Sequence, residues 1–272
     1  MTVLISWIIF ALYILSCSFY WQGFSRNRTT NYHWAQRVLV LTLVCHLGLI
    51  CFLTLQYGRI PIANLSEALS TFVWLTSCIY IVLEWRLKNY SMGAFILTIL
   101  SILMAIGIIT FQNNEAIPEV LKDVKFEAHV LALLISYGSF SISFIASLLH
   151  TLLDREIQKR RFRLFYSRLP SLPFFQRISN FAIDIGLAFA TIGIGLGILQ
   201  AMTIWENFFL TDPKFLTAAL TWLIYCFHFL GRRFAGWGAQ RSATISLIGF
   251  SLLLFSFLII SLFFTSLHNF TD

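Results

Sequence analysis

The sequence predicts an all-α fold, a polytopic membrane helix bundle with about eight transmembrane helices. Its composition is the first reason: 58% of the 272 residues are hydrophobic and only 11% are charged. A soluble domain of this length could not bury so much apolar surface, so lipid must surround much of the chain. Backbone polar groups inside a bilayer have to be paired within their own segment, so uniformly apolar stretches are expected to be helices.

The second reason is the recurrence of apolar stretches about as long as a bilayer is thick. They cover residues 3–21, 38–55, 68–84, 91–111, 129–150, 181–204, 215–230 and 242–265. The seventh is the shortest. The intervening loops are mostly short and no repeat occurs, so residues 1–272 are predicted to form a single membrane domain with antiparallel neighbouring helices.

The distribution of basic residues predicts the orientation. If the N-terminus is outside, the inner segments hold 15 of the 19 Lys and Arg residues. These are Arg26, Arg28, Arg37, Arg86, Lys88, Arg155, Lys159, Arg160, Arg161, Arg163, Arg168, Arg177, Arg232, Arg233 and Arg241. The outer segments hold the other four and most of the acids. Because cytoplasmic loops collect Lys and Arg, both the N-terminus and the C-terminus are predicted to lie outside.

Several function classes find no support in the sequence. The net charge of +7 follows from the basic inner loops, so no nucleic acid partner is expected. All five cysteines fall inside apolar stretches without CxxC spacing, which argues against disulfides and thiolate metal sites. Residues 3–21 lack a basic n-region and a cleavage site, so they are expected to be a retained helix. No hydrolase, P-loop or metalloprotease motif occurs.

The longest inner loop, residues 152–179, combines basic residues with apolar and aromatic ones. Arginine side chains meet anionic headgroups and aromatic rings enter the interface, so this loop is predicted to lie along the inner surface of the lipid bilayer.

Two histidines are predicted to share the outer face. His129 opens the fifth apolar stretch and His268 closes the eighth, and the aromatic loop Trp205–Lys214 lies between those stretches in sequence. A porphyrin is a flat apolar disc whose iron takes axial imidazoles, so this arrangement would suit heme. The alternative is that each histidine only anchors a helix end among the headgroups.

Two further histidines, His46 and His228, lie within apolar stretches. An ionisable group at membrane depth is costly and indicates a function, here holding heme on its way across. Hydrogen bonding to a neighbouring helix for packing is the equally open alternative. His33 and His150 are expected at the inner surface, exposed to water.

Small and polar residues in the fifth and sixth stretches indicate close helix packing and interhelical hydrogen bonds. They are Ser136, Tyr137, Ser139, Ser141 and Ser143 in one, and Gly186, Gly193, Gly195 and Gly197 in the other. Asp184, near the inner end of the sixth stretch, is expected to pair with a nearby arginine.

Several segments together resemble the cytochrome c assembly family of membrane proteins, which includes the CcsA, CcmC and HemX-like groups. Gly58–Leu69 resembles the family's outer stretch GHFPLSNLYESL, and Ala128–Val130 with Ile135–Phe140 resembles its HV...SYA segment. The remaining likenesses are Arg177–Gly197, Thr211–Lys214, which is similar to WDPKE, Leu220–Ile224, which is similar to LITWLI, and Leu262–His268.

In that family two outer histidines and a tryptophan-rich loop bind heme, so the resemblance implies these roles here. His129 and His268 would ligate the iron of heme b, with Trp205, Phe208, Phe209, Asp212 and Pro213 as the platform. His46 and His228 complete the expected cofactor-binding residues. The chain departs from the family where Phe208 and Phe209 stand in a region richer in Trp and Gly, and where Arg59 replaces a common His.

The resemblance implies a heme-handling protein of c-type cytochrome biogenesis in a bacterial cytoplasmic (inner) membrane. Its expected partners are heme, an apocytochrome c and a second cytochrome-assembly membrane subunit. No catalytic residue is predicted, and the chain is not expected to be an enzyme by itself, although it could be a subunit of a heme lyase. The length is closest to the short HemX-like branch, so the alternative function is a non-catalytic regulator or scaffold linked to tetrapyrrole synthesis.

Overall fold

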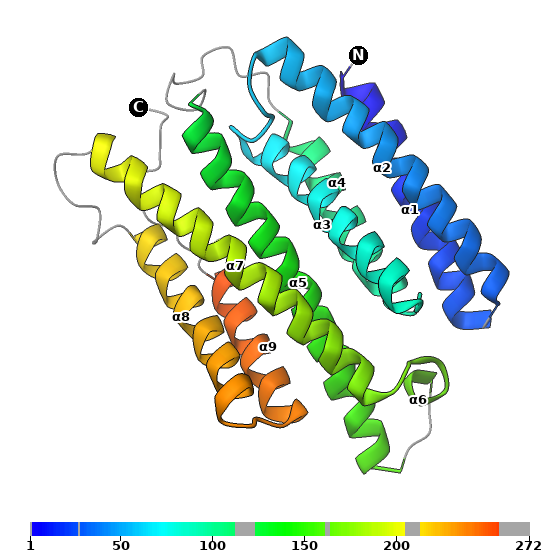
Figure 1. The fold of residues 1–272 in the computed structure, drawn as a ribbon. Coiled ribbons are helices and arrows are strands. Elements are labelled where there is room, and N and C mark those ends of the chain that lie inside the picture. The colour runs from blue at the N-terminus through cyan, green and yellow to red at the C-terminus, as the bar shows by residue number, and fades with distance from the viewer. Residues whose placement is uncertain (1, 27, 112–122, 161–163, 205–212, 256–272) are drawn as a thin grey trace. The chain divides into compact units, whose positions relative to one another are not determined.

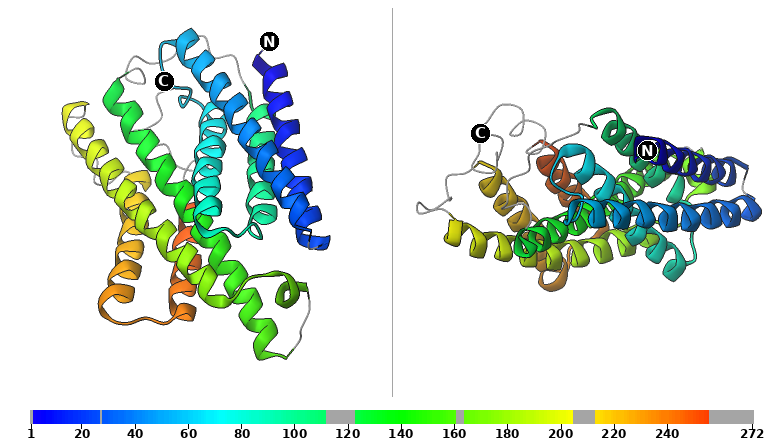
Figure 2. Two further views of the ribbon diagram at one scale, coloured as in Figure 1. Left: turned by 45° about the vertical axis from the view of Figure 1, so that its right-hand side comes forward. Right: turned by 90° about the horizontal axis from the view of Figure 1, so that it is seen from above.

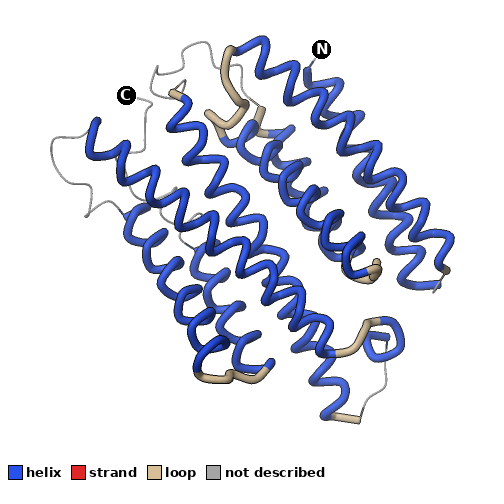
Figure 3. Tube along the Cα trace, in the orientation of Figure 1, coloured by secondary structure: helices blue, strands red, loops and turns tan. Residues whose placement is uncertain are grey.

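The computed structural model describes residues 2–26, 28–111, 123–160, 164–204 and 213–255. Every regular element in these ranges is a helix (Figure 1, Figure 3). The helices are α1 (Thr2–Arg26), α2 (Thr29–Tyr57), α3 (Leu65–Leu87), α4 (Gly93–Ile109), α5 (Val124–Gln158), α6 (Leu164–Arg168), α7 (Leu172–Ile204), α8 (Pro213–Phe234) and α9 (Ala239–Phe255). The predicted all-α fold is therefore confirmed.

Each of the eight predicted apolar stretches overlaps a helix, the last of them over residues 242–255, where the described part of the chain ends. Six of them, α1, α2, α3, α5, α7 and α8, are long and apolar enough to cross a membrane, and α4 and α9 are shorter apolar helices within the described ranges. Large apolar side chains on the outsides of helices are exposed, for example Leu55 at 86% and Leu199 at 65%. These features fit a polytopic integral membrane protein, in which such side chains face lipid. The count of eight spans and the outer position of both termini stay predictions.

The helices flanking the longest predicted inner loop are longer than expected. α5 runs to Gln158 instead of ending near residue 150, α7 begins at Leu172 instead of residue 181, and the short α6 lies between them. The length of an apolar stretch is set by the thickness of the hydrocarbon layer. A helix can continue beyond that stretch wherever the following residues are good helix formers. Charged residues such as Glu156 are good helix formers, and Pro173 is tolerated in the first turn of α7.

The described helices fall into two compact units. The N-terminal unit consists of α1 to α4 with residues 155–170, and the C-terminal unit consists of residues 123–154 of α5 with α7, α8 and α9. The single membrane domain stays a prediction.

In the N-terminal unit, α1 packs on α2 and α4, and α3 packs on α4 and α2 (Figure 1, Figure 2). Its interior contains aromatic and aliphatic side chains that are almost fully buried, such as Tyr13, Tyr20 and Leu97. The hydroxyl of Ser16 donates to the carbonyl of Ala35 at 2.9 Å, which ties α1 to α2.

In the C-terminal unit, α8 packs on α7 and α9, and α7 also packs on α9. The rings of Phe140 on α5 and Tyr225 on α8 are stacked with centroids 3.7 Å apart and planes 8° from parallel. Around this stack lie Ile183, Ala190, Phe250 and Leu253, which with it make up the core of the unit.

Candidate functional site

The structure describes three of the predicted cofactor-binding histidines, His46, His129 and His228. The other predicted ligand, His268, and the predicted platform residues Trp205, Phe208, Phe209 and Asp212 lie outside the described residues. Pro213 is the first residue of α8. Whether His129 and His268 share one iron therefore stays a prediction.

His129 lies in the second turn of α5, at the end of the helix that is predicted to face outside. Its Nδ1 atom is 2.7 Å from the carbonyl oxygen of Gly193 on α7. A carbonyl oxygen can only accept, so in this hydrogen bond Nδ1 carries the proton. In the neutral ring the lone pair is then on Nε2, the nitrogen that would bind a metal.

Where α5 and α7 cross, three large side chains of α5 each lie against a glycine of α7. A Cβ added at Gly197 would lie 2.5 Å from Cε1 of His129, one at Gly193 would lie 2.8 Å from Leu133, and one at Gly186 would lie 2.5 Å from Phe140. The three glycines are thus spaced along α7 by the same numbers of residues as their three partners along α5, in the opposite direction, so the two helices are antiparallel. The predicted tight crossing is confirmed at these three glycines.

Gly195 differs from the other glycines of α7. A Cβ added there would meet nothing within 4 Å. No described neighbour would collide with a side chain at this position, so the prediction of tight packing is wrong for Gly195.

His46 lies inside the N-terminal unit and is fully buried. Its Nδ1 is 3.1 Å from the hydroxyl of Tyr13 on α1, and its Nε2 is 2.9 Å from the hydroxyl of Ser70 on α3. The ring therefore links three helices, as the packing alternative predicts. A metal could bind this imidazole only if one of the two hydrogen bonds were broken.

His228 on α8 is also fully buried, but its environment is different. Neither ring nitrogen makes a hydrogen bond of normal geometry to a described residue, although the backbone of Ser242 on α9 lies close to the ring. The hydroxyl of Ser242 is also buried without a partner among the described residues. A buried polar group in this state is costly, which favours a ligand over packing as the role of this histidine.

The two histidines that were expected in water at the inner surface differ from each other. His33 is exposed and lies edge-on to Tyr90. His150 is buried, with 4% of its surface exposed, so the expectation was wrong for this residue. The reason is that α5 continues for two more turns, which leaves position 150 inside the packed part of the helix.

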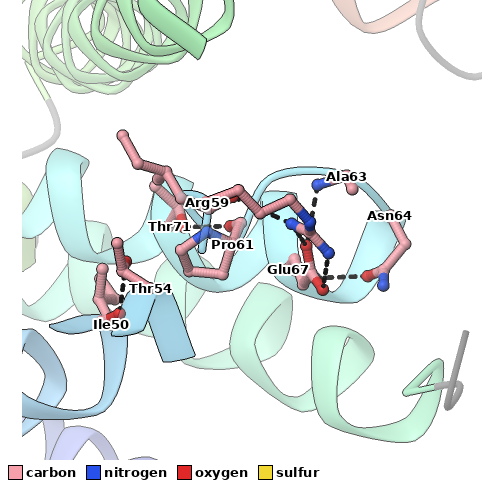
Figure 4. Close-up of polar contacts among 9 residues, drawn as sticks. Ile50, Thr54, Arg59, Pro61, Ala63, Asn64, Glu67 and Thr71 are labelled. Atoms are coloured by element: carbon pink, nitrogen blue, oxygen red, sulfur yellow. Dashed lines mark hydrogen bonds and ion pairs between the residues drawn. The ribbon is translucent and has the colours of Figure 1, made fainter. Parts of the chain in front are cut away.

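A buried ion pair organises the loop between α2 and α3, which is predicted to lie outside (Figure 4). Both Nη atoms of Arg59 donate to the carboxylate of Glu67, at 2.7 and 3.0 Å, and Nη1 also donates to the carbonyl of Ile60. The same carboxylate accepts from the backbone N–H of Ala63 at 2.9 Å. The side chain of Asn64 caps α3 by accepting from the N–H of Glu67 at 2.8 Å.

Sequence reasoning missed this ion pair. The signal was available, because Asn64 and Glu67 have the spacing of a capping box at the start of a helix. An acid in that position is near enough to the preceding loop to pair with Arg59.

A buried carboxyl group lies at the other end of the N-terminal unit. Glu84 on α3 accepts hydrogen bonds from the hydroxyls of Tyr20 at 2.7 Å and Tyr80 at 2.5 Å, and from the amide of Gln36 at 2.9 Å. Three uncharged donors from α1, α2 and α3 thus surround one carboxyl, and no described Lys or Arg forms an ion pair with it. The group ties three helices together at this level.

The C-terminal unit contains the predicted polar contacts between helices. The hydroxyl of Ser143 on α5 is 2.8 Å from those of Ser179 on α7 and Ser246 on α9. Arg232 of α8 forms an ion pair with Asp184 of α7. The expected arginine partner for Asp184 and the expected interhelical bonding of Ser143 are both confirmed. Ser139 and Ser141 instead bond to carbonyls of their own helix.

Comparison with known proteins decides the family. Residues 62–268 match the family model described as Cytochrome C assembly protein. The chain belongs to the cytochrome c assembly protein family. The predicted resemblance to this family is confirmed, and the match includes residues 62–64 of the loop before α3, His129 and His268.

Several relatives in this family are named cytochrome c biogenesis protein CcsA. The protein of Trieres chinensis is 22% identical over 97% of this chain and 95% of its own length. That of Chlorella vulgaris is 26% identical over 81% of this chain and 82% of its own length. That of Chlamydomonas reinhardtii is 28% identical over 78% of this chain, and the match spans 61% of the algal protein.

Proposed function

We propose that this member of the cytochrome c assembly family handles heme during c-type cytochrome biogenesis. In this proposal heme b is the cargo, and it is held at the outer face between His129 and His268. The loop of residues 205–214 provides a flat aromatic surface beside the porphyrin. Membership of the family and the shared name of the relatives support the process, and the chemistry of His129 supports the cargo.

The observation that carries the proposal is the hydrogen bond from Nδ1 of His129 to the carbonyl of Gly193. Histidines that bind metals usually donate their other ring N–H to a carbonyl or carboxylate, which fixes the tautomer and the ring orientation. The described part of the site therefore fits the donor that heme iron requires. A histidine serving only as a headgroup anchor would need no such second contact inside the protein.

Within the membrane, His228 is the better supported of the two predicted heme-holding histidines. Both of its ring nitrogens lack a normal hydrogen bond among the described residues, whereas both nitrogens of His46 are occupied. We therefore assign His228 to transient heme binding and His46 to joining helices α1, α2 and α3.

The chain's own contribution is to bind and orient. Two axial imidazoles hold the iron, and the aromatic loop fixes the plane of the porphyrin, which would bring its vinyl groups near the thiols of an apocytochrome. Those thiols belong to the apocytochrome, because all five cysteines of this chain lie within helices. The chain is in this view a subunit that acts with a second membrane protein, in a bacterial cytoplasmic membrane.

The experiment is to purify the protein in detergent from heme-replete cells and record its absorption spectrum. The proposal predicts a pigmented protein whose heme extracts as heme b and whose spectrum is that of iron with two histidine ligands. His129→Ala and His268→Ala should each remove most of the pigment.

The matched control is His33→Ala, because His33 is exposed and lies in the other unit from His129. This variant should retain its pigment. A colourless wild-type protein that also fails to bind added heme would overturn the proposal. That result would favour the alternative prediction, a non-catalytic regulator or scaffold.

A further inference from the structure

We infer that Gly197, acting with the backbone carbonyl of Gly193, is a positioning residue for the imidazole of His129. The inference rests on the proposed function, since it concerns how that ligand is presented to iron. Gly197 would not touch heme. Its role is to leave the space in which the ring of His129 lies, so that Nδ1 meets the carbonyl of Gly193.

The geometry fixes the ring from two sides. The carbonyl oxygen of Gly193 is 2.7 Å from Nδ1, a distance typical of a good hydrogen bond. One helical turn further along α7, the surface over Gly197 is occupied by the same ring. The imidazole therefore lies against α7 at two positions, 193 and 197, neither of which has a side chain.

An alanine at position 197 could not be accommodated without moving the ring. Its Cβ would lie 2.5 Å from Cε1, 2.8 Å from Nδ1 and 3.4 Å from Nε2 of His129. The first two distances are far inside normal contact. The ring could swing away, because it is the end of a side chain, but the movement would carry Nδ1 away from the carbonyl oxygen of Gly193.

Two other glycines of the same helix separate this role from ordinary helix packing. Gly186 is crowded to the same degree as Gly197, but by Phe140 and not by a histidine. It lies 11 residues from Gly197, which is roughly 16 Å along a helix. Gly195 is two residues from Gly197 and has open space around it. An alanine at 186 therefore disturbs the α5 and α7 crossing alone, and an alanine at 195 disturbs neither.

The first test uses the heme-free protein. Nitrogen-15 NMR of histidine-labelled protein in detergent, with the His129 signal assigned by its loss in His129→Gln, reports which ring nitrogen carries the proton. We expect the Nδ1–H tautomer in wild type, Gly186→Ala and Gly195→Ala. In Gly197→Ala the His129 signal should shift to a mixture of tautomers.

The second test is titration of the same four proteins with heme. Loss of a contact that orients a metal ligand typically weakens binding by about 10-fold to 100-fold. We expect a loss of this size in Gly197→Ala and wild-type affinity in Gly195→Ala. Gly186→Ala should unfold at a lower temperature than wild type and yet bind heme with nearly wild-type affinity.

The inference is overturned if Gly197→Ala keeps both the wild-type tautomer and the wild-type affinity. It is also overturned if Gly186→Ala and Gly197→Ala lose affinity equally, since helix packing would then explain both. Failure of the proposed function looks different. In that case wild type itself does not bind heme, whereas the tautomer of His129 and its dependence on position 197 are still measured.

Discussion

At the scale of single residues, three of the buried polar groups in the N-terminal unit have well-defined hydrogen-bond partners. Arg59 is paired with Glu67, Glu84 has three donors, and His46 has two. In lipid a buried polar group cannot turn to water, so each unsatisfied one is costly. Among the described residues with buried unpartnered atoms, His228 is the one with two such atoms, and this favours a ligand there.

The buried ion pair of the loop before α3 gives a prediction for stability. In Arg59→Leu the carboxylate of Glu67 loses a bidentate partner while remaining nearly buried, and breaking such a pair typically costs about 3–5 kcal/mol. The measurement is thermal or denaturant unfolding in detergent. We expect a large drop for Arg59→Leu and a smaller one for Arg59→Leu combined with Glu67→Leu. The exposed Arg28→Ala serves as the control, and equal loss in the single and double variants would contradict the prediction.

For His228 we predict that a single substitution raises the stability of the heme-free protein and lowers heme binding. His228→Leu removes two buried nitrogens that lack a hydrogen bond of normal geometry to any described residue. Each such group costs about 1–3 kcal/mol, so the heme-free protein should unfold at a higher temperature. The same variant should retain less heme on purification. His46→Leu, which breaks two hydrogen bonds, should lower the unfolding temperature instead. A destabilised His228→Leu would show that the ring has a packing role.

At the scale of elements, the positions of the helices could be predicted from the sequence, but the contacts between helices could not. Hydropathy marked each apolar stretch because bilayer thickness sets a minimum length. It did not show that α5 and α7 extend past the predicted apolar stretches. Nor could it show that His129 meets Gly193, because a contact between residues 64 apart in sequence depends on the register of two helices.

The serine contacts between helices give a prediction at this scale. Ser143→Ala removes the hydroxyl that bonds to both Ser179 and Ser246, and interhelical hydrogen bonds in membranes average about 0.6 kcal/mol each. We expect a loss of roughly 1 kcal/mol in unfolding free energy. Thr244→Ala is the control, because its hydroxyl is exposed and, within the described residues, bonds to the carbonyl of Gln240 in its own helix. Equal effects of the two substitutions would mean that the serine contacts do not join the helices.

At the scale of the whole molecule, the fold class and the family could both be predicted from the sequence, and both are confirmed. Composition alone excludes a soluble protein, and a set of separate motifs indicated the family. The division of the described helices into two compact units was not predicted, because it depends on which helices pack together and not on hydropathy.

The predicted orientation is tested by reporter fusions. An enzyme that is active only outside the cytoplasmic membrane, fused after Asp272, should be active in a bacterial host. The same enzyme fused after Gln158, where basic residues gather, should be inactive, and a fluorescent protein that folds only in the cytoplasm should give the reverse pattern. Activity of the outer reporter at Gln158 would contradict the orientation and place His129 on the inner side.

The central claim is that two imidazoles of this chain hold one heme iron. Electron paramagnetic resonance of the oxidised, purified protein tests it most directly. The account predicts a low-spin signal with two nitrogen ligands in wild type. The heme that remains in His129→Ala and in His268→Ala should give a high-spin signal, and added imidazole should restore the low-spin signal in either variant. A wild-type signal in both variants would contradict the account.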